Sequence, residues 1–180
     1  MFDSPVLQSL LDDQFMPLGP GEPREEFREN LASLTTASLL APTPVVRPAF
    51  AEACISGLWL RHNFLDESHR ISQDLPSVEG SCWHAIMHRR EPDYGNSKYW
   101  FRRVGRHRIF AELKERAGSF AATGGAAALL AKPQWDAEAF VDLCEANAAP
   151  DAPAHEFCRQ VQQVEWELLF AHCWREAIEE

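Results

Sequence analysis

Histidines and a carboxylate recur at helical spacing in the stretch "WHAIMHRREPD", residues 83–93. His84, His88 and Glu91 are separated by four and then three residues. On a helix with about 3.6 residues per turn, these three side chains lie within about 40° of one line along the surface. The spacing therefore predicts one polar stripe that holds two imidazoles and a carboxylate.

A second polar stripe precedes the first. Asp66, His69 and Gln73 are separated by three and then four residues, and only the turn "LPSVEG" and its flanks lie between the two stretches. Helices joined by so short a connection usually pack as neighbours. If both stripes face the same gap, imidazoles, carboxylates and an amide come together there.

Such a group of side chains could bind a divalent metal ion, and zinc, iron and manganese are the candidates. Imidazole and carboxylate are common ligands for these ions, and the H-x-x-x-H spacing presents two imidazoles on one side of a helix. We expect His84, His88 and Glu91 to be the ligands, with His69 as the next candidate. Three protein ligands would leave a position for water.

Two other interpretations of the same residues remain open. In a metal-free enzyme, Asp66, His69 and Glu91 would be the catalytic acid and base groups, because a histidine beside a carboxylate titrates near neutral pH. In a protein without a site, the histidines would form a buried polar network whose members satisfy one another.

A basic and aromatic segment, "YGNSKYWFRRVGRHR" at residues 94–108, follows directly. Arginine forks grip carboxylate and phosphate groups, and aromatic rings stack on ligands. We therefore expect an anionic small molecule as the ligand. The residues predicted to bind it are Gln73, Arg89, Asn96, Lys98, Tyr99, Arg102 and Arg103. The alternative is a non-catalytic interaction protein, whose basic face at 98–108 docks an acidic partner while the histidines are structural.

The charge distribution narrows the function classes. The net charge is -10, yet residues 84–116 hold nine Lys and Arg against four acids, which makes that window +5 and the remainder -15. An acidic chain with one basic island argues against a general nucleic-acid binder. No apolar run approaches the roughly 20 residues of a membrane span, and the start "MFDSPVLQSLLDDQ" lacks the basic residues of a signal peptide.

The cysteines indicate a cytoplasmic protein. There are five of them, an odd number, at widely spaced positions and without a CxxC pair. Reduced and mostly buried thiols are the expectation for such a pattern. The sequence leaves the oligomeric state open.

The elements that must position these residues are helices. Apolar residues recur at three-to-four spacing through most of the chain, and no segment shows the alternation of a strand. The sequence predicts an all-α protein, a single domain over residues 1–180 with about eight helices. Its site segment is 62–108, and "GSFAATGG" at 118–125 is a loop. The predicted helices cover 4–13, 24–40, 48–62, 65–74, 79–91, 96–104, 107–117, 134–147 and 153–178.

Residues 66–107 also carry a resemblance. The strings S-H-x-x-x-Q from Ser68, W-H-A-I-M-H-R-R-E-x-D from Trp83 and N-x-K-Y-W-F-R-R from Asn96 are similar to the core of a family of small uncharacterised proteins. The likeness covers about a quarter of the chain. It implies that the site lies in this region, and it implies no activity, cofactor or fold.

Overall fold

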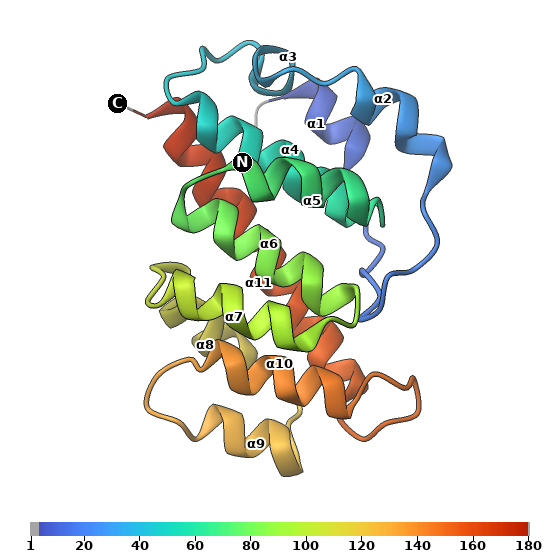
Figure 1. Cartoon of the computed structure of the whole chain (residues 1–180), viewed down its shortest axis with the longest axis vertical. Coiled ribbons are helices and arrows are strands. Elements are labelled where there is room, and N and C mark those ends of the chain that lie inside the picture. The colour runs from blue at the N-terminus through green and yellow to red at the C-terminus, as the bar shows by residue number, and fades with distance from the viewer. Residues whose placement is uncertain (1–3, 180) are drawn as a thin grey trace.

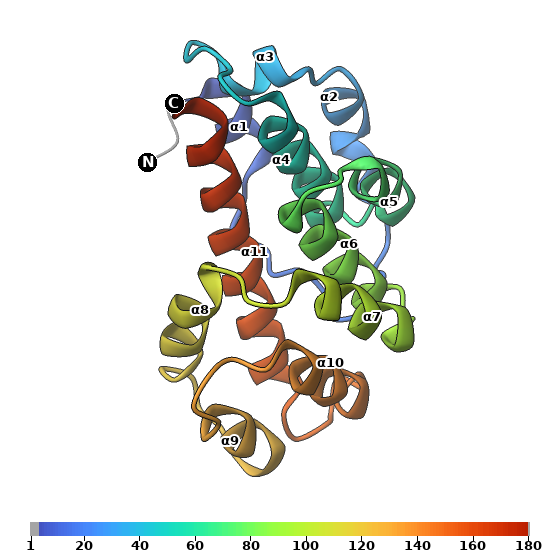
Figure 2. The same ribbon diagram turned by 60° about the vertical axis from the view of Figure 1, so that its left-hand side comes forward.

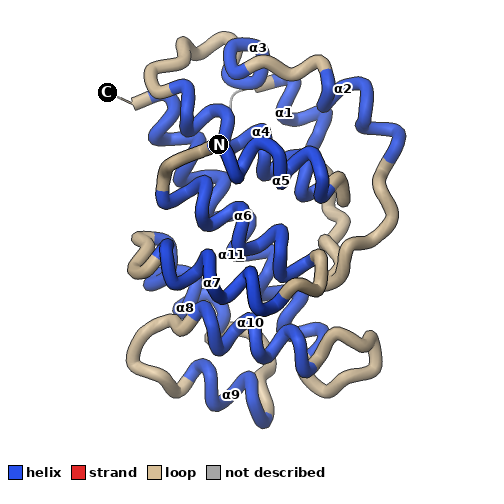
Figure 3. The backbone as a smooth tube through the Cα atoms, viewed as in Figure 1, coloured by secondary structure: helices blue, strands red, loops and turns tan. Residues whose placement is uncertain are grey.

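The computed structural model describes residues 4–179, and these residues form eleven α-helices, one 3-10 helix and no strand (Figure 3). The prediction of an all-α protein is confirmed. The last eight helices, α4 to α11, each have seven or more residues.

The helices are labelled in Figure 1, and their bounds follow. They are α1 (Pro5–Leu10), the 3-10 helix η1 (Glu25–Phe27), α2 (Arg28–Ala32), α3 (Thr36–Leu40), α4 (Pro48–Arg61), α5 (Leu65–Asp74), α6 (Val78–Arg90), α7 (Tyr94–Val104), α8 (Ile109–Ala117), α9 (Gly124–Leu130), α10 (Ala137–Ala146) and α11 (His155–Ile178).

The helices stack along the long C-terminal helix. Helix α5 packs against α4 and α6, and α7 packs against α6 and α10. Figure 1 shows α5, α6, α7, α10 and α9 one below another, with α11 running behind them. The turned view in Figure 2 shows α8 on the other side of α11. The stack places the site segment, α5 to α7, in the middle of the molecule.

The helices α4, α6 and α11 meet in close contact at Gly57. A Cβ atom at this position would lie 2.7 Å from the ring of Trp83 on α6, so only glycine leaves room for that ring. The indole of Trp166 on α11 donates a 2.7 Å hydrogen bond to the carbonyl oxygen of Gly57. Trp83 and Trp166 are both buried, and this contact fixes α6 against the two helices behind it.

A buried arginine at the end of α6 holds the N-terminal segment, which we define as residues 11–24. The guanidinium of Arg90 is fully buried and has no carboxylate partner within residues 4–179. It donates to the carbonyl oxygens of Gly19, Pro20 and Leu60 and to Oδ1 of Asn63. Burial, and then the charge of neighbouring Arg89, lower the pKa of Arg90 to about 9. The cationic side chain can be buried here because its hydrogen-bond donors are satisfied.

His62, at the end of α4, holds the last residue of α1, which directly precedes this segment. Its Nε2 donates to the carbonyl oxygen of Leu10 over 2.8 Å, and its ring stacks on Phe27 with centroids 4.0 Å apart. The side chain is completely buried. Burial lowers the pKa of His62 to about 4, and the charges of Arg24 and Arg61 add to the effect against the Leu10 hydrogen bond.

Two expectations about the elements are corrected. Residues 24–40 form three short helices instead of one, because Thr35 caps α3 through a reciprocal pair of bonds with Ser38. The predicted loop at 118–125 is non-helical only as far as Thr123, and α9 begins at Gly124.

Two other expectations concern membranes and thiols. Within residues 4–179, no helix combines the length and the apolar character needed to cross a bilayer. All five cysteines are free and buried.

Candidate metal centre

Three imidazoles from α5 and α6 come together in one cluster, which we call the histidine cluster: His69, His84 and His88. Their nearest ring nitrogens all lie within 4.8 Å of one another. The Nε2 atoms of His84 and His88 are 3.0 Å apart, and the ring centroids of His69 and His84 are 4.6 Å apart. The helical spacing predicted this convergence, and the packing of α5 on α6 produces it.

The outer nitrogen of His88 faces a carboxylate. Nδ1 of His88 lies 2.9 Å from Oε2 of Glu91, the residue that follows α6. An ionised carboxylate only accepts hydrogen bonds, so Nδ1 carries the proton and Nε2 keeps its lone pair. This arrangement, in which a carboxylate fixes the tautomer of a histidine, is typical of metal-binding histidines.

The outer nitrogen of His84 faces a hydroxyl. Oγ of Ser72 lies 3.0 Å from Nδ1 of His84 and 3.2 Å from the carbonyl oxygen of His69. When the hydroxyl donates to that carbonyl, it accepts the proton of His84 Nδ1, and His84 Nε2 also keeps a lone pair. With this placement of the protons, two lone pairs face each other at 3.0 Å, and a metal ion between them would stabilise the pair.

The size of the cluster fits a metal ion. Nitrogens that bind one zinc ion at about 2.0–2.1 Å with tetrahedral angles lie roughly 3.3 Å apart. The pair from His84 and His88 is already close to this separation, at 3.0 Å. His69 is half-buried, so its ring has room to turn toward the other two. A fourth group is near, since Nδ2 of Asn96 lies 3.0 Å from Nε2 of His88 and the amide could present its oxygen instead.

The two histidines of the cluster that lie on α6, His84 and His88, resist protonation. Burial, and then the neighbouring His88 and His69, lower the pKa of His84 to about 3. Burial also lowers the pKa of His88, and this effect outweighs the opposing charge of Glu91. Both imidazoles are therefore neutral at pH 7, which is the form that binds a metal.

The structure does not bring all of the predicted α5 stripe into the cluster. Asp66 and Gln73 are exposed, and among the described residues no hydrogen bond or ion pair joins either of them to the histidines. The buried line of α5 passes through Ser68 and Ser72. Asp66 and Gln73 lie about 160° and 140° away from Ser68 at 100° per residue, so they face solvent.

Two residues of the α6 stretch are also placed differently from the prediction. Glu91 lies behind His88, on its outer nitrogen, and not beside the nitrogens that converge. Arg89 lies in the core, where its guanidinium forms a 2.5 Å ion pair with Glu165 and both side chains are completely buried. It also lies over the ring of Phe140, so it cannot reach a ligand at the surface.

Two cations of the predicted basic wall pair with acids of α10 and not with the histidine cluster. Lys98 forms a 2.7 Å ion pair with Asp142, and Arg102 forms a 2.6 Å ion pair with Glu138. Arg103 lies over the ring of Trp100. Tyr99 is exposed, and its hydroxyl accepts a long hydrogen bond of 3.4 Å from Arg103. From α7, Asn96 reaches His88, and the ring of Trp100 lies 4.3 Å from that of His84.

A second cluster, Glu79, His107 and His172, was not predicted. Oε1 of Glu79 lies 3.1 Å from Nε2 of His172 and 3.7 Å from Nε2 of His107. The three residues come from α6, the α7–α8 connection and α11, so no local spacing marks them in the sequence. Burial raises the pKa of Glu79, but the imidazole of His107, 3.7 Å away, and the hydrogen bond from His172 outweigh it and hold the pKa well below its usual range.

Proton placement distinguishes the two clusters. Both contain donors that could hold a metal ion. In the second cluster, the backbone N–H of Ile109 donates to Nδ1 of His107 over 3.3 Å, so in the neutral ring Nε2 carries the proton. The Nε2–H group of His107 faces the carboxylate of Glu79. The second cluster is therefore arranged to stabilise a buried carboxylate, and the histidine cluster on α5 and α6 is the better candidate for a metal.

Comparisons with family models, with curated proteins and with solved structures found no match to this chain.

Proposed function

We propose that this protein binds a divalent metal ion through His69, His84 and His88 and uses it in an enzyme or binding site for a small molecule. The observation that carries the proposal is the 3.0 Å approach of two Nε2 atoms whose outer nitrogens are occupied by Glu91 and Ser72. Zinc and iron suit an all-imidazole set better than manganese, which prefers oxygen ligands.

The surroundings of the cluster favour a reactive site over a closed structural one. Three protein ligands leave a coordination position for water or substrate, whereas structural zinc sites have four. His69 and Asn96 are only half-buried, and Glu91 is exposed, so the cluster is close to the surface. A bound metal would lower the pKa of a coordinated water or polarise a substrate oxygen. Glu91 and Asp93 are the carboxylates next to His88 that could accept a proton.

The alternative, a basic docking face at 98–108, has less support. Lys98 and Arg102 are already paired with acids of α10, and an acidic partner would have to displace those acids. The proposal also includes a cytoplasmic location and no nucleic-acid partner. The net charge of -10 argues against nucleic acid, and the five free cysteines favour the cytoplasm.

Titration with cobalt(II), followed by its visible absorption and by elemental analysis, tests the proposal. Tag-free protein should bind about one equivalent at this site, with the intense visible bands of a low-coordinate site. His84→Ala and His88→Ala should each weaken binding by at least about 100-fold, because each removes a direct ligand.

Two control variants locate the site. His155→Gln removes a histidine that bonds only the carbonyl oxygen of Asn147, and it should leave binding unchanged. His172→Gln disrupts the second cluster and should also leave the cobalt spectrum unchanged. The proposal is wrong if tag-free protein retains less than about 0.1 equivalents after zinc, iron and manganese are offered. It is also wrong if His84→Ala and His88→Ala bind as the wild type does.

A further inference from the structure

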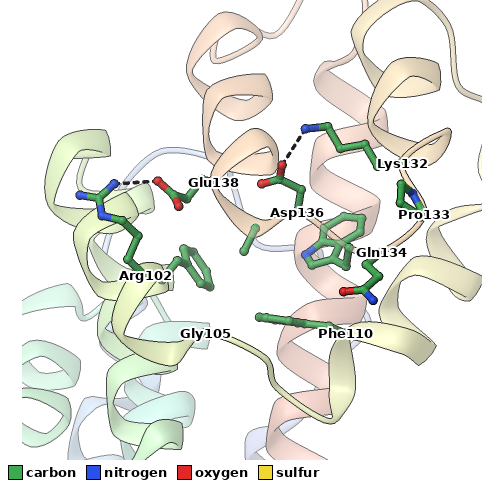
Figure 4. Close-up of a pocket in the computed structure, with 11 residues that line it drawn as sticks. Arg102, Gly105, Phe110, Lys132, Pro133, Gln134, Asp136 and Glu138 are labelled. Carbon is green, nitrogen blue, oxygen red and sulfur yellow. Dashed lines mark hydrogen bonds and ion pairs between the residues drawn. The ribbon is translucent and has the colours of Figure 1, made fainter.

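Two adjoining cavities lie between the start of α8 and the connection from α9 to α10. Their volumes are about 630 and 410 Å³, within the range of small-molecule sites. The residues that line both are Gly105, Phe110, Pro133, Gln134 and Trp135. We call the two cavities together the α8 groove, and Figure 4 shows its larger part with the ring of Phe110 at one side.

The two ends of the α8 groove differ in charge. At one end the cations are neutralised, because Lys132 pairs with Asp136 and Arg102 pairs with Glu138, as the dashed lines in Figure 4 show. At the other end lie Arg106 and Lys114, and neither has an ion-pair partner in residues 4–179.

The wall of the groove between these ends is aromatic and holds one unsatisfied donor. Phe110 and Trp135 are both more than nine-tenths buried. Nε1 of Trp135 is buried and has no hydrogen-bond partner among the described residues. Buried donors are nearly always satisfied in native proteins, so this unpaired indole N–H beside the groove favours an acceptor that a ligand brings.

We propose that the α8 groove binds a small aromatic anion. Its carboxylate, sulfonate or phosphate group would lie between Arg106 and Lys114, and its ring would lie against Phe110 and Trp135. Charge-assisted hydrogen bonds to the anion and stacking on the aromatic wall supply the affinity. This site is separate from the histidine cluster, and it does not depend on the proposed metal. It places the anion-binding function on Arg106, on α8 and on residues 133–135, and of these only Arg106 lies in the segment 62–108 that the sequence indicated.

A titration with anilinonaphthalene sulfonate, an aromatic sulfonate whose fluorescence rises in apolar surroundings, tests this site. Wild-type protein should bind one equivalent, and the indole N–H signal of Trp135, assigned by its loss in Trp135→Phe, should shift during the titration. The double variant Arg106→Ala, Lys114→Ala should bind at least about tenfold more weakly, because both partners of the anionic group are removed.

A matched double variant separates a site from a general effect of charge. Arg70→Ala, Arg175→Ala removes two exposed cations on α5 and α11 and changes the net charge by the same amount. Its affinity should stay within about twofold of the wild type. Methanesulfonate, which has the anionic group but no ring, should compete at least about 100-fold more weakly than the aromatic probe. An equal loss in the two double variants, an unmoved Trp135 signal or equal competition by methanesulfonate would overturn the proposal.

Discussion

The direction in which one imidazole presents its lone pair decides what the histidine cluster can do. His88 contacts Glu91 through Nδ1, and His84 and Asn96 through Nε2. Because Glu91 accepts the proton of Nδ1, the nitrogen that faces the cluster is the one able to bind a metal. In the second cluster, the backbone of Ile109 has the opposite effect on His107.

Glu91→Gln tests this role of the carboxylate. The amide keeps the size of the side chain but loses its charge, and it no longer fixes the tautomer of His88. We expect metal affinity to fall by about 10–100-fold, the usual cost of losing such a partner, while the cobalt stoichiometry stays at one. Competition with a chromophoric chelator measures the change.

Glu156→Gln is the matched control for this variant. Glu156 pairs with Arg159 at the start of α11, and replacing it with glutamine removes the same negative charge. Its metal affinity should equal that of the wild type. Equal affinities in Glu91→Gln and wild type would show that Glu91 does not orient His88.

At the scale of elements, the stack of helices brings the cluster together, and a close contact between α4 and α6 lies behind the site. The ring of Trp83 occupies the space that a side chain at Gly57 would need. Trp83 directly precedes His84 on α6, so the fit of α4 against α6 also sets the position of the histidine cluster.

Gly57→Ala should therefore destabilise the protein by about 1–3 kcal/mol, the usual cost of overpacking a core. The free energy of unfolding from urea titrations measures it. Gly95→Ala is the matched control, since a Cβ atom at Gly95 would have no neighbour closer than 3.9 Å. Gly95 lies in the first turn of α7, so there alanine should stabilise by about 0.4–1 kcal/mol. A neutral Gly57→Ala would contradict the tight contact between α4 and α6.

The sequence could predict what depends on local spacing. The histidines at 84 and 88 and their neighbour at 69 follow from helical periodicity and a short connection, and the all-α class follows from the same pattern. It could not predict that Lys98 and Arg102 would turn to α10, because that requires knowing how α7 docks. The second cluster joins residues 79, 107 and 172, and only tertiary packing connects positions so far apart.

At the scale of the whole molecule, buried histidines link stability to pH. The ordinary pKa of histidine is about 6.5, and that of folded His62 is about 4. Below about pH 6.5 the unfolded chain binds a proton at this residue while the folded chain does not. The contribution of His62 to the free energy of unfolding is therefore fully present above about pH 6.5. It is lost as the pH falls toward about 4, by up to about 1.4 kcal/mol per pH unit.

His62→Gln should flatten this decline. The amide of glutamine can still donate to the carbonyl oxygen of Leu10, but it does not titrate. We expect the difference in the free energy of unfolding between pH 7.5 and 5.5, measured with a chelator present, to shrink by up to about 1.4 kcal/mol. His155→Gln is the control, since this half-buried histidine bonds the carbonyl oxygen of Asn147 and not that of Leu10, and the difference should not shrink as it does in His62→Gln. An undiminished difference in His62→Gln would assign the pH dependence to other groups.

The docking of residues 11–24 has a consequence for the order in which the chain assembles during synthesis. These residues leave the ribosome before Arg90, which binds the carbonyl oxygens of Gly19 and Pro20 and follows some 70 residues later. Residues 11–24 must therefore wait, without their native partner, until α6 has emerged and folded against α4.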